Sequence, residues 1–203
     1  MRRLATLALF ASLLLTGACS DSDEPIGPVP DADLTLAEAA ALAGLFAGEA
    51  IGSTAGQVPN GAAAVAGAPV PFDLALSVTA PCPLGGEVAF QGSVVGELDV
   101  EAESLSVTFT ASQVHASCTV DAEGTTVTVS GNPGLNLTSH LTVAGNPPEG
   151  THTATLTGGF TWSSADGREG DCDIDVSTTV DVGTETGSAS GTVCGHSVDV
   201  TVR

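Results

Sequence analysis

Hydrophobic and polar residues alternate along the chain from residue 70 to the C-terminus, a pattern typical of β-strands that bury one face. The longest run covers 72–80, and shorter runs follow it, separated by turn-forming sequences rich in Gly, Asn, Asp and Pro. The pattern predicts a mainly β domain at 70–203: an antiparallel sheet of about nine or ten strands, with one buried and one solvated face. A sandwich and a partly open barrel both fit this pattern. The shorter runs are 105–109, 127–129, 135–137, 141–143, 174–182 and 198–202, and the turn sequences are 121–124, 131–134, 145–148 and 166–168.

A single helix is predicted before the sheet, over residues 34–52. Thr35 and Glu38 match a capping box, in which each side chain accepts a hydrogen bond from a free N–H of the first turn. Glu38 and Glu49 argue against a membrane-spanning helix. A ridge of small residues recurs every four positions, and we expect it to pack closely against the sheet. The ridge consists of Ala40, Gly44, Gly48 and Gly52. The helix also has a wide apolar face, which consists of Leu36, Ala39, Ala40, Leu42, Ala43, Phe46, Ala47 and Ala50. Residues 53–69 are rich in Gly, Ala and Pro and are interpreted as a linker.

The N-terminus has the three parts of a secretory signal peptide. Two arginines precede an apolar stretch at 4–15, which is shorter than the roughly 20 residues that a transmembrane helix needs. Thr16-Gly17-Ala18-Cys19 then resembles the lipobox of bacterial lipoproteins. The resemblance implies a signal peptide at 1–18, cleavage before Cys19, and acylation of Cys19, for example with palmitate, as the membrane anchor. The alternative is an ordinary signal peptide that is cut near a cysteine.

The residues after Cys19 have the composition of a tether. The segment 19–33 is acidic and rich in proline, and it contains too little apolar surface to fold on its own. Ser20, directly after the cysteine, resembles lipoproteins that are sorted to the outer membrane. The resemblance to lipoproteins covers only residues 1–20. It implies an exported protein in the cell envelope, held at the outer membrane by its lipid.

The charge is strongly one-sided because basic residues are nearly absent. The chain has 24 acidic and 4 basic residues, a net charge of −20, and no lysine; its cations are Arg2, Arg3, Arg168 and Arg203. This composition excludes the basic surface that nucleic-acid binding requires. It also predicts electrostatic repulsion from anionic lipid and phosphate surfaces.

Once Cys19 is assigned to the lipid, the other four cysteines predict two disulfides. Cys82, Cys118, Cys172 and Cys194 do not have the spacing of a zinc site, and an exported chain oxidises its thiols. Three connectivities exist for four cysteines. We favour Cys82–Cys118 and Cys172–Cys194, because each pair closes a local set of hairpins. Strand alternation places all four cysteines on the core side, Cys118 together with Val114 and Ala116.

No constellation of residues indicates catalysis, and no cofactor is predicted. Gly187-Ser188-Ala189-Ser190-Gly191 fails the nucleophile-elbow pattern because its central residue is alanine. A sugar-binding platform could use only Phe160 and Trp162. Asp171, Asp173 and Asp175 share one strand face and are weak candidates for calcium ligands, but a solvated acidic face explains them better. The four histidines show no ligand spacing and are interpreted as structural or surface residues: His115, His140, His152 and His196.

Two classes of function fit these features. The first is a non-catalytic interaction or structural domain, whose Ser- and Thr-rich sheet face meets a protein partner in the envelope. The second is a carrier of a lipid or another apolar ligand, with the helix covering a curved sheet. The second resembles lipid-shuttling outer-membrane lipoproteins in architecture alone, which is analogy.

Overall fold

The structure, a computed structural model, describes residues 33–55, 68–122 and 124–202. The predicted signal peptide, the acylated Cys19, the tether up to residue 32 and most of the predicted linker therefore lie outside the described residues. The described chain consists of one helix followed by nine β-strands, which confirms the mainly β fold with a preceding helix. The elements are α1 (Leu36–Ala55), β1 (Val70–Pro81), β2 (Glu87–Asp99), β3 (Ser104–Ala116), β4 (Cys118–Ala122), β5 (Thr125–Ala144), β6 (Glu149–Ser164), β7 (Glu169–Asp181), β8 (Thr186–Val193) and β9 (His196–Val202).

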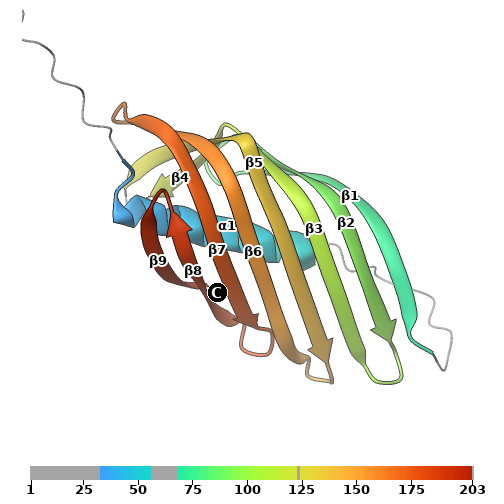
Figure 1. The fold of residues 1–203 in the computed structure, drawn as a ribbon. Helices are drawn as coiled ribbons and strands as arrows, with labels where there is room; N and C mark the ends of the chain where they lie inside the picture. Colours follow the sequence, from blue (N-terminus) through green and yellow to red (C-terminus); the bar gives the residue numbers. More distant parts are fainter. Residues whose placement is uncertain (1–32, 56–67, 123, 203) are drawn as a thin grey trace, which may run out of the picture. The chain divides into compact units, whose positions relative to one another are not determined.

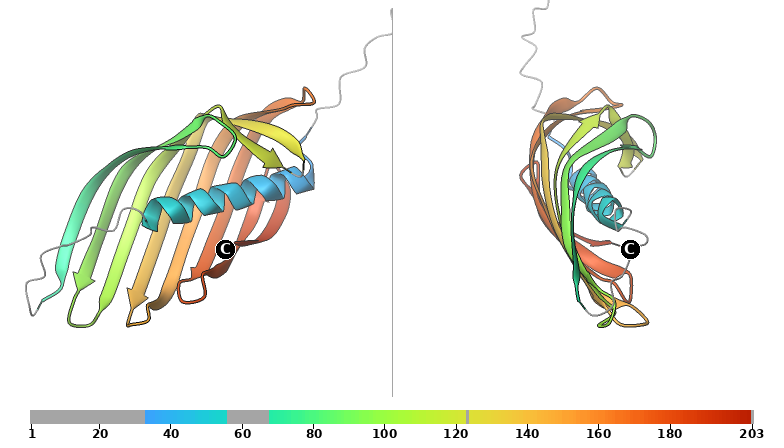
Figure 2. Two further views of the ribbon diagram at one scale, coloured as in Figure 1. Left: turned by 180° about the vertical axis from the view of Figure 1, so that it is seen from behind. Right: turned by 90° about the vertical axis from the view of Figure 1, so that its right-hand side faces the viewer.

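All nine strands belong to one antiparallel sheet. Its order is β1-β2-β3-β5-β6-β7-β8-β9, so almost every strand pairs with its neighbour in sequence, and β4 pairs with the first part of β5. β1 and β9 are the two edges and do not pair with each other, so the sheet stays open (Figure 1). The sheet is curved, and α1 lies across its concave face (Figure 2). Of the two predicted architectures, this one is closer to the partly open barrel.

Strand β5 corrects one predicted turn. The sequence 131–134, with Gly at both ends, was expected to separate two strands, but β5 continues through it. The register between β5 and β6 shifts between Ser130 and Gly134, as in a β-bulge. Gly134 has a φ of 105°, which favours glycine, so the Gly-rich sequence makes an irregularity within a strand.

The expected facing of the end of β3 was wrong. Val114 and Ala116 are exposed, whereas His115 and Cys118 are buried. The reason is Ser117, which has a φ of 52° and breaks the two-residue alternation between β3 and β4. The core-facing side of β3 therefore continues as Val107, Phe109, Ala111, Gln113 and His115.

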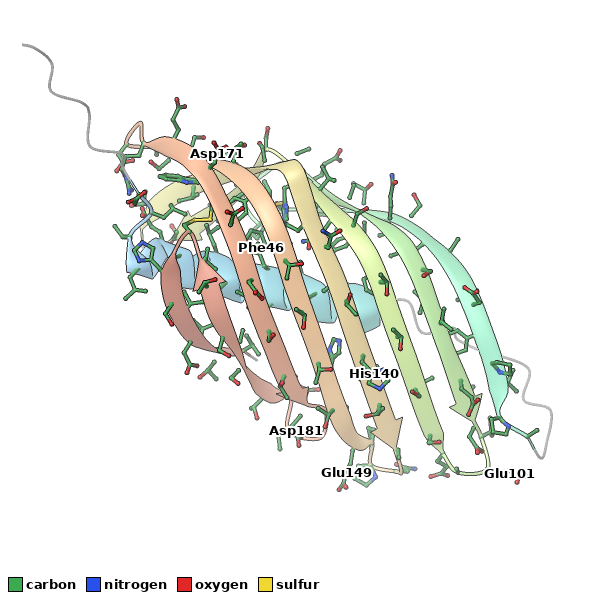
Figure 3. The ribbon with its side chains drawn as sticks, in the orientation of Figure 1. Phe46, Glu101, His140, Glu149, Asp171 and Asp181 are labelled. Carbon is green, nitrogen blue, oxygen red and sulfur yellow. A yellow bond between two sulfur atoms is a disulfide. The ribbon has the colours of Figure 1, made fainter. Side chains whose placement is uncertain are left out.

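The core lies between α1 and the concave face of the sheet. Phe46 of α1 (labelled in Figure 3) meets Phe160 and His115 edge to face, with ring centroids 5.3 and 5.1 Å apart. The helix packs mainly against the β8–β9 side of the sheet. The helix residues that are buried in this way are Ala39, Leu42, Ala43, Phe46, Ala47 and Ala50.

The start of α1 is fixed to the sheet by polar contacts. The predicted capping box is present: Glu38 Oε2 accepts from Thr35 N (2.8 Å), and Thr35 Oγ1 accepts from Glu38 N (3.2 Å). Glu38 is 3% exposed and also receives two hydrogen bonds from Arg168, at 2.5 and 3.1 Å. His196 donates to the carbonyl of Leu34 (2.6 Å). The sole Lys or Arg of the described residues thus holds the helix in place.

The two disulfides have the connectivity favoured from the sequence. Cys82, just after β1, is bonded to Cys118 at the start of β4, and Cys172 of β7 is bonded to Cys194 between β8 and β9. The first joins the β1 edge of the sheet to the short strand β4. The second fixes the β8–β9 hairpin, which carries the other edge, to β7.

A buried histidine makes folding sensitive to pH. His152 Nε2 lies 2.7 Å from Ser139 Oγ inside the sheet, and burial lowers the pKa of this imidazole below its ordinary value of 6.5. As the pH falls below 6.5, the unfolded chain binds a proton that the folded chain does not bind. We expect the free energy of unfolding to fall from pH 7 to pH 5.5. The double variant His152→Leu/Ser139→Ala should show a smaller fall in urea titrations, and an equal fall would contradict this assignment.

Candidate functional site: an apolar groove beside the helix

The three glycines of the small-residue ridge on α1 line open space. We expected the ridge to pack closely against the sheet, and this expectation was wrong for Gly44, Gly48 and Gly52, whereas Ala40 is half-buried and packs against the core. A Cβ atom added to Gly44, Gly48 or Gly52 would meet nothing within 4 Å, apart from the helix's own backbone. The physical reason is the larger side chains of α1: Gly48 follows Phe46 by two positions and so lies about 200° around the helix from it. Burial of the large apolar face determines how the helix sits, and the ridge remains uncovered.

This open space is a groove of about 500 Å³ between the second half of α1 and the strands β1 and β2. Ligand-binding pockets in proteins have volumes of roughly 300–1,000 Å³ and predominantly apolar walls. The groove fits both criteria, and Glu49 is the one charged residue in its wall. The lining residues are Gly44, Leu45, Gly48, Glu49 and Gly52 of the helix, and Leu76, Val78, Ala80, Pro81, Pro83, Val88 and Phe90 from β1, β2 and their connection.

The inward face of β1 contributes apolar side chains that the core does not cover. Alternation predicts that Leu74, Leu76 and Val78 all face inward, yet only Leu76 is buried. Leu74 and Val78 are 41% and 36% exposed. Because α1 packs mainly on the β8–β9 side, this edge of the concave face stays open to solvent. A cluster of exposed apolar residues in a concave site is the usual sign of a binding surface.

One part of the groove wall is polar. Glu49 Oε2 accepts a hydrogen bond from Gln113 Nε2 at 2.5 Å and lies 3.0 Å from His115 Nε2. The side chain of Glu49 is 13% exposed, while Gln113 and His115 are buried. Two buried polar atoms of this cluster, Gln113 Oε1 and His115 Nδ1, have no hydrogen-bond partner among the described residues. The site therefore combines an apolar groove with a carboxylate in its wall.

The disulfide Cys82–Cys118 lies beside this carboxylate. A carboxylate oxygen of Glu49 and the two sulfur atoms lie within 4.8 Å of one another, a spacing at which three ligands could hold a metal ion. The sulfurs are bonded to each other, however, and so are not the thiolates that a metal would need. This cluster is therefore structural in the oxidised protein.

The metal candidates predicted from the sequence lie elsewhere. Asp171, Asp173 and Asp175 are exposed on the outer face of β7, opposite α1 (Asp171 is labelled in Figure 3). Within the described ranges, Glu49, Cys82 and Cys118 form the one group of three potential ligands that converge, so the structure does not bring the three aspartates together in this way.

The other residues singled out from the sequence are dispersed. His140 is exposed on the outer face, where its Nδ1 lies 3.3 Å from Thr108 Oγ1 (Figure 3). Phe160 and Trp162 are both buried, so neither ring offers a platform for a sugar. The guanidinium carbon of Arg168 lies 5.9 Å from the centre of the Trp162 ring.

The polar cluster of Glu49, Gln113 and His115 was not predicted from the sequence. The signal was present in β3: when the alternation of Val107 and Phe109 is continued, it reaches Gln113 and His115. Polar residues at positions of core parity require partners, which points to a buried polar group on the facing element. The break of alternation at Ser117 concealed this signal, because parity counted backward from Cys118 gives the opposite face.

Comparison of this chain with protein families, with curated proteins and with solved structures finds no match. No helix in the described part of the chain combines the length and the apolarity needed to cross a bilayer.

Proposed function

We propose that this protein is an exported, lipid-anchored binding protein that holds a small apolar ligand in the groove between α1 and β1–β2. The observation that carries the proposal is the open apolar groove, whose glycine ridge and exposed β1 residues no other described residue covers. A volume of about 500 Å³ suits a single acyl or alkyl chain more than a phospholipid with two long chains.

The cost of keeping the groove open supports a role in binding. Glycine within a helix destabilises it by roughly 0.5–1 kcal/mol relative to alanine, and α1 has three glycines along the groove. A Cβ atom at any of these positions would meet nothing within 4 Å beyond the helix's own backbone. A purely structural domain would gain stability by filling this space, whereas a carrier needs the space empty for its ligand.

The cellular location forms part of the proposal. The lipobox-like sequence before Cys19 supports acylation there, and Ser20 supports the outer membrane. Two disulfides are compatible with export from the reducing cytoplasm. The role as an interaction domain is the alternative, and its surface would be the exposed, Thr-rich outer face of the sheet.

The test is to fill the groove. Gly48→Leu should place a side chain in the open space and abolish binding of a neutral apolar probe such as dodecanol, measured by calorimetry on the whole chain. The same variant should be more stable by about 1 kcal/mol in urea unfolding, because leucine is a far better helix former than glycine.

Thr155→Leu provides the matched control. Thr155 is exposed on the outer face of β6, so this change adds an apolar side chain outside the groove and should leave dodecanol binding intact. If Gly48→Leu binds dodecanol as the wild type does, or if neither protein binds it, the proposal is wrong.

A further inference from the structure

We propose that the groove selects amphiphiles whose polar end is a cationic amine, and that Glu49 binds this ammonium group. The inference rests on the proposed function, because it identifies the class of ligand for the same groove. Three observations support this inference: the position of Glu49 in the groove wall, the atoms that surround its carboxylate, and the scarcity of cations in the chain.

The carboxylate of Glu49 has one oxygen without a hydrogen bond from the described residues. Both of its hydrogen bonds in the described structure use Oε2, with Gln113 Nε2 and His115 Nε2 as donors. Glu49 lines the groove between Gly48 and Gly52, and its side chain is 13% exposed. Oε1 is therefore the carboxylate atom that remains for a donor carried by a ligand in the groove.

No Lys or Arg among the described residues pairs with Glu49. Arg168 is the only Lys or Arg among the described residues, and its guanidinium is bound to Glu38 and Asp166. Glu38 and Glu49 are eleven positions apart on one helix, which corresponds to roughly 16 Å. A ligand ammonium would supply Glu49 with the full positive charge that no described Lys or Arg provides.

The side chain of Gln113 reinforces this selection because its carbonyl oxygen is an acceptor. Gln113 directs its amide nitrogen to Glu49, so its oxygen remains without a donor. His115 Nε2 lies 3.0 Å from the carboxylate, and its Nδ1 is buried without a partner among the described residues. The buried Gln113 oxygen does not reach the ligand, but it makes the region more electronegative. A fatty-acid carboxylate in the same position would be repelled by Glu49.

The test compares three ligands that share one chain length: dodecylammonium, dodecanol and dodecanoate, titrated below their aggregation concentrations into the whole protein. We expect dodecylammonium to bind about tenfold more tightly than dodecanol, which corresponds to 1.4 kcal/mol, and dodecanoate to bind more weakly than dodecanol. In Glu49→Gln the amine should lose its tenfold advantage over dodecanol, with both ligands measured on the same variant, and detectable dodecanol binding shows that the groove remains folded.

Asp175→Asn is the charge-matched control. It removes one negative charge from the outer face of β7, away from the groove. A loss of amine affinity in this variant would show that the amine is attracted by the net charge of −20 and not by a specific site at Glu49. Equal or tighter binding of dodecanoate, or an unchanged amine affinity in Glu49→Gln, would overturn the inference and leave the apolar groove standing. If none of the three ligands binds, the proposed function itself fails.

Discussion

Replacement of both Cys82 and Cys118 by alanine is expected to lower the free energy of unfolding by about 3–4 kcal/mol. The two residues are separated by 36 positions, so their bond removes much of the chain entropy of the unfolded state. The bond also joins the end of β1 to β4, and Pro81 and Pro83, which flank Cys82, line the groove. We therefore expect weaker dodecanol binding in addition to the loss of stability. Urea unfolding of the oxidised protein and calorimetry measure the two effects.

The second disulfide provides the comparison. Cys172 and Cys194 are separated by 22 positions, and the same entropy argument gives a cost of about 3 kcal/mol when both are replaced by alanine. This bond lies at the β7–β9 side and contributes no residue to the groove, so the folded variant should bind dodecanol normally. Equal loss of binding in the two double variants would contradict the placement of the site beside β1.

Arg168→Ala is expected to destabilise the protein by about 2–3 kcal/mol. Removal of the guanidinium leaves the buried Glu38 carboxylate at the start of α1 without a counter-ion, and breaking a buried pair in this way is strongly destabilising. We place the effect below that of a fully buried pair because part of the Arg168 side chain is exposed. Arg168 also contacts the Trp162 ring, so Arg168→Met, which keeps an apolar stem, separates the loss of charge from the loss of packing.

The pH dependence of stability tests whether Glu38 is the partner through which Arg168 stabilises the fold. Hydrogen bonds from Arg168, with those from Thr35, hold the pKa of the Glu38 carboxyl below its ordinary value of 4.5 despite burial. The stabilisation by the ionised Glu38 is therefore fully present above pH 4.5. It is lost as the pH falls through the lower pKa that Glu38 has in the folded state. In Arg168→Met this acid-induced loss should be smaller. Asp166→Asn, which removes the exposed partner of Arg168, should change stability little. A large effect from Asp166→Asn would contradict the assignment to Glu38.

Much of the fold follows from local patterns in the sequence. The alternation from Phe72 onward predicted an antiparallel sheet, and the Thr35–Glu38 capping box predicted where the helix begins. Both signals are local, because side chains of a strand alternate between faces and a helix cap involves residues three positions apart. Almost all strand neighbours are also consecutive in sequence, which made the local disulfide pairing a sound choice.

The site could not be predicted in the same way, because it depends on how α1 sits on the sheet. The sequence shows that Gly44, Gly48 and Gly52 form a ridge, but not whether a strand fills it. Which face of α1 packs against the sheet, the ridge or the larger apolar face with Phe46, depends on three-dimensional packing. A single residue with positive φ, Ser117, likewise reversed the expected facing of the last part of β3. The partnership of Glu49 with Gln113 joins residues 64 positions apart and leaves no local pattern.

The most direct test of the account is native mass spectrometry of the chain exported by bacterial cells with Cys19→Ser, so that no acyl anchor is attached. We expect a protein with two disulfides that carries an additional small molecule, which is released on denaturation, contains an alkyl chain with an amine and is absent from Gly48→Leu. A protein of the same mass before and after denaturation, with no difference between wild type and Gly48→Leu, would contradict the account of the groove as a ligand site.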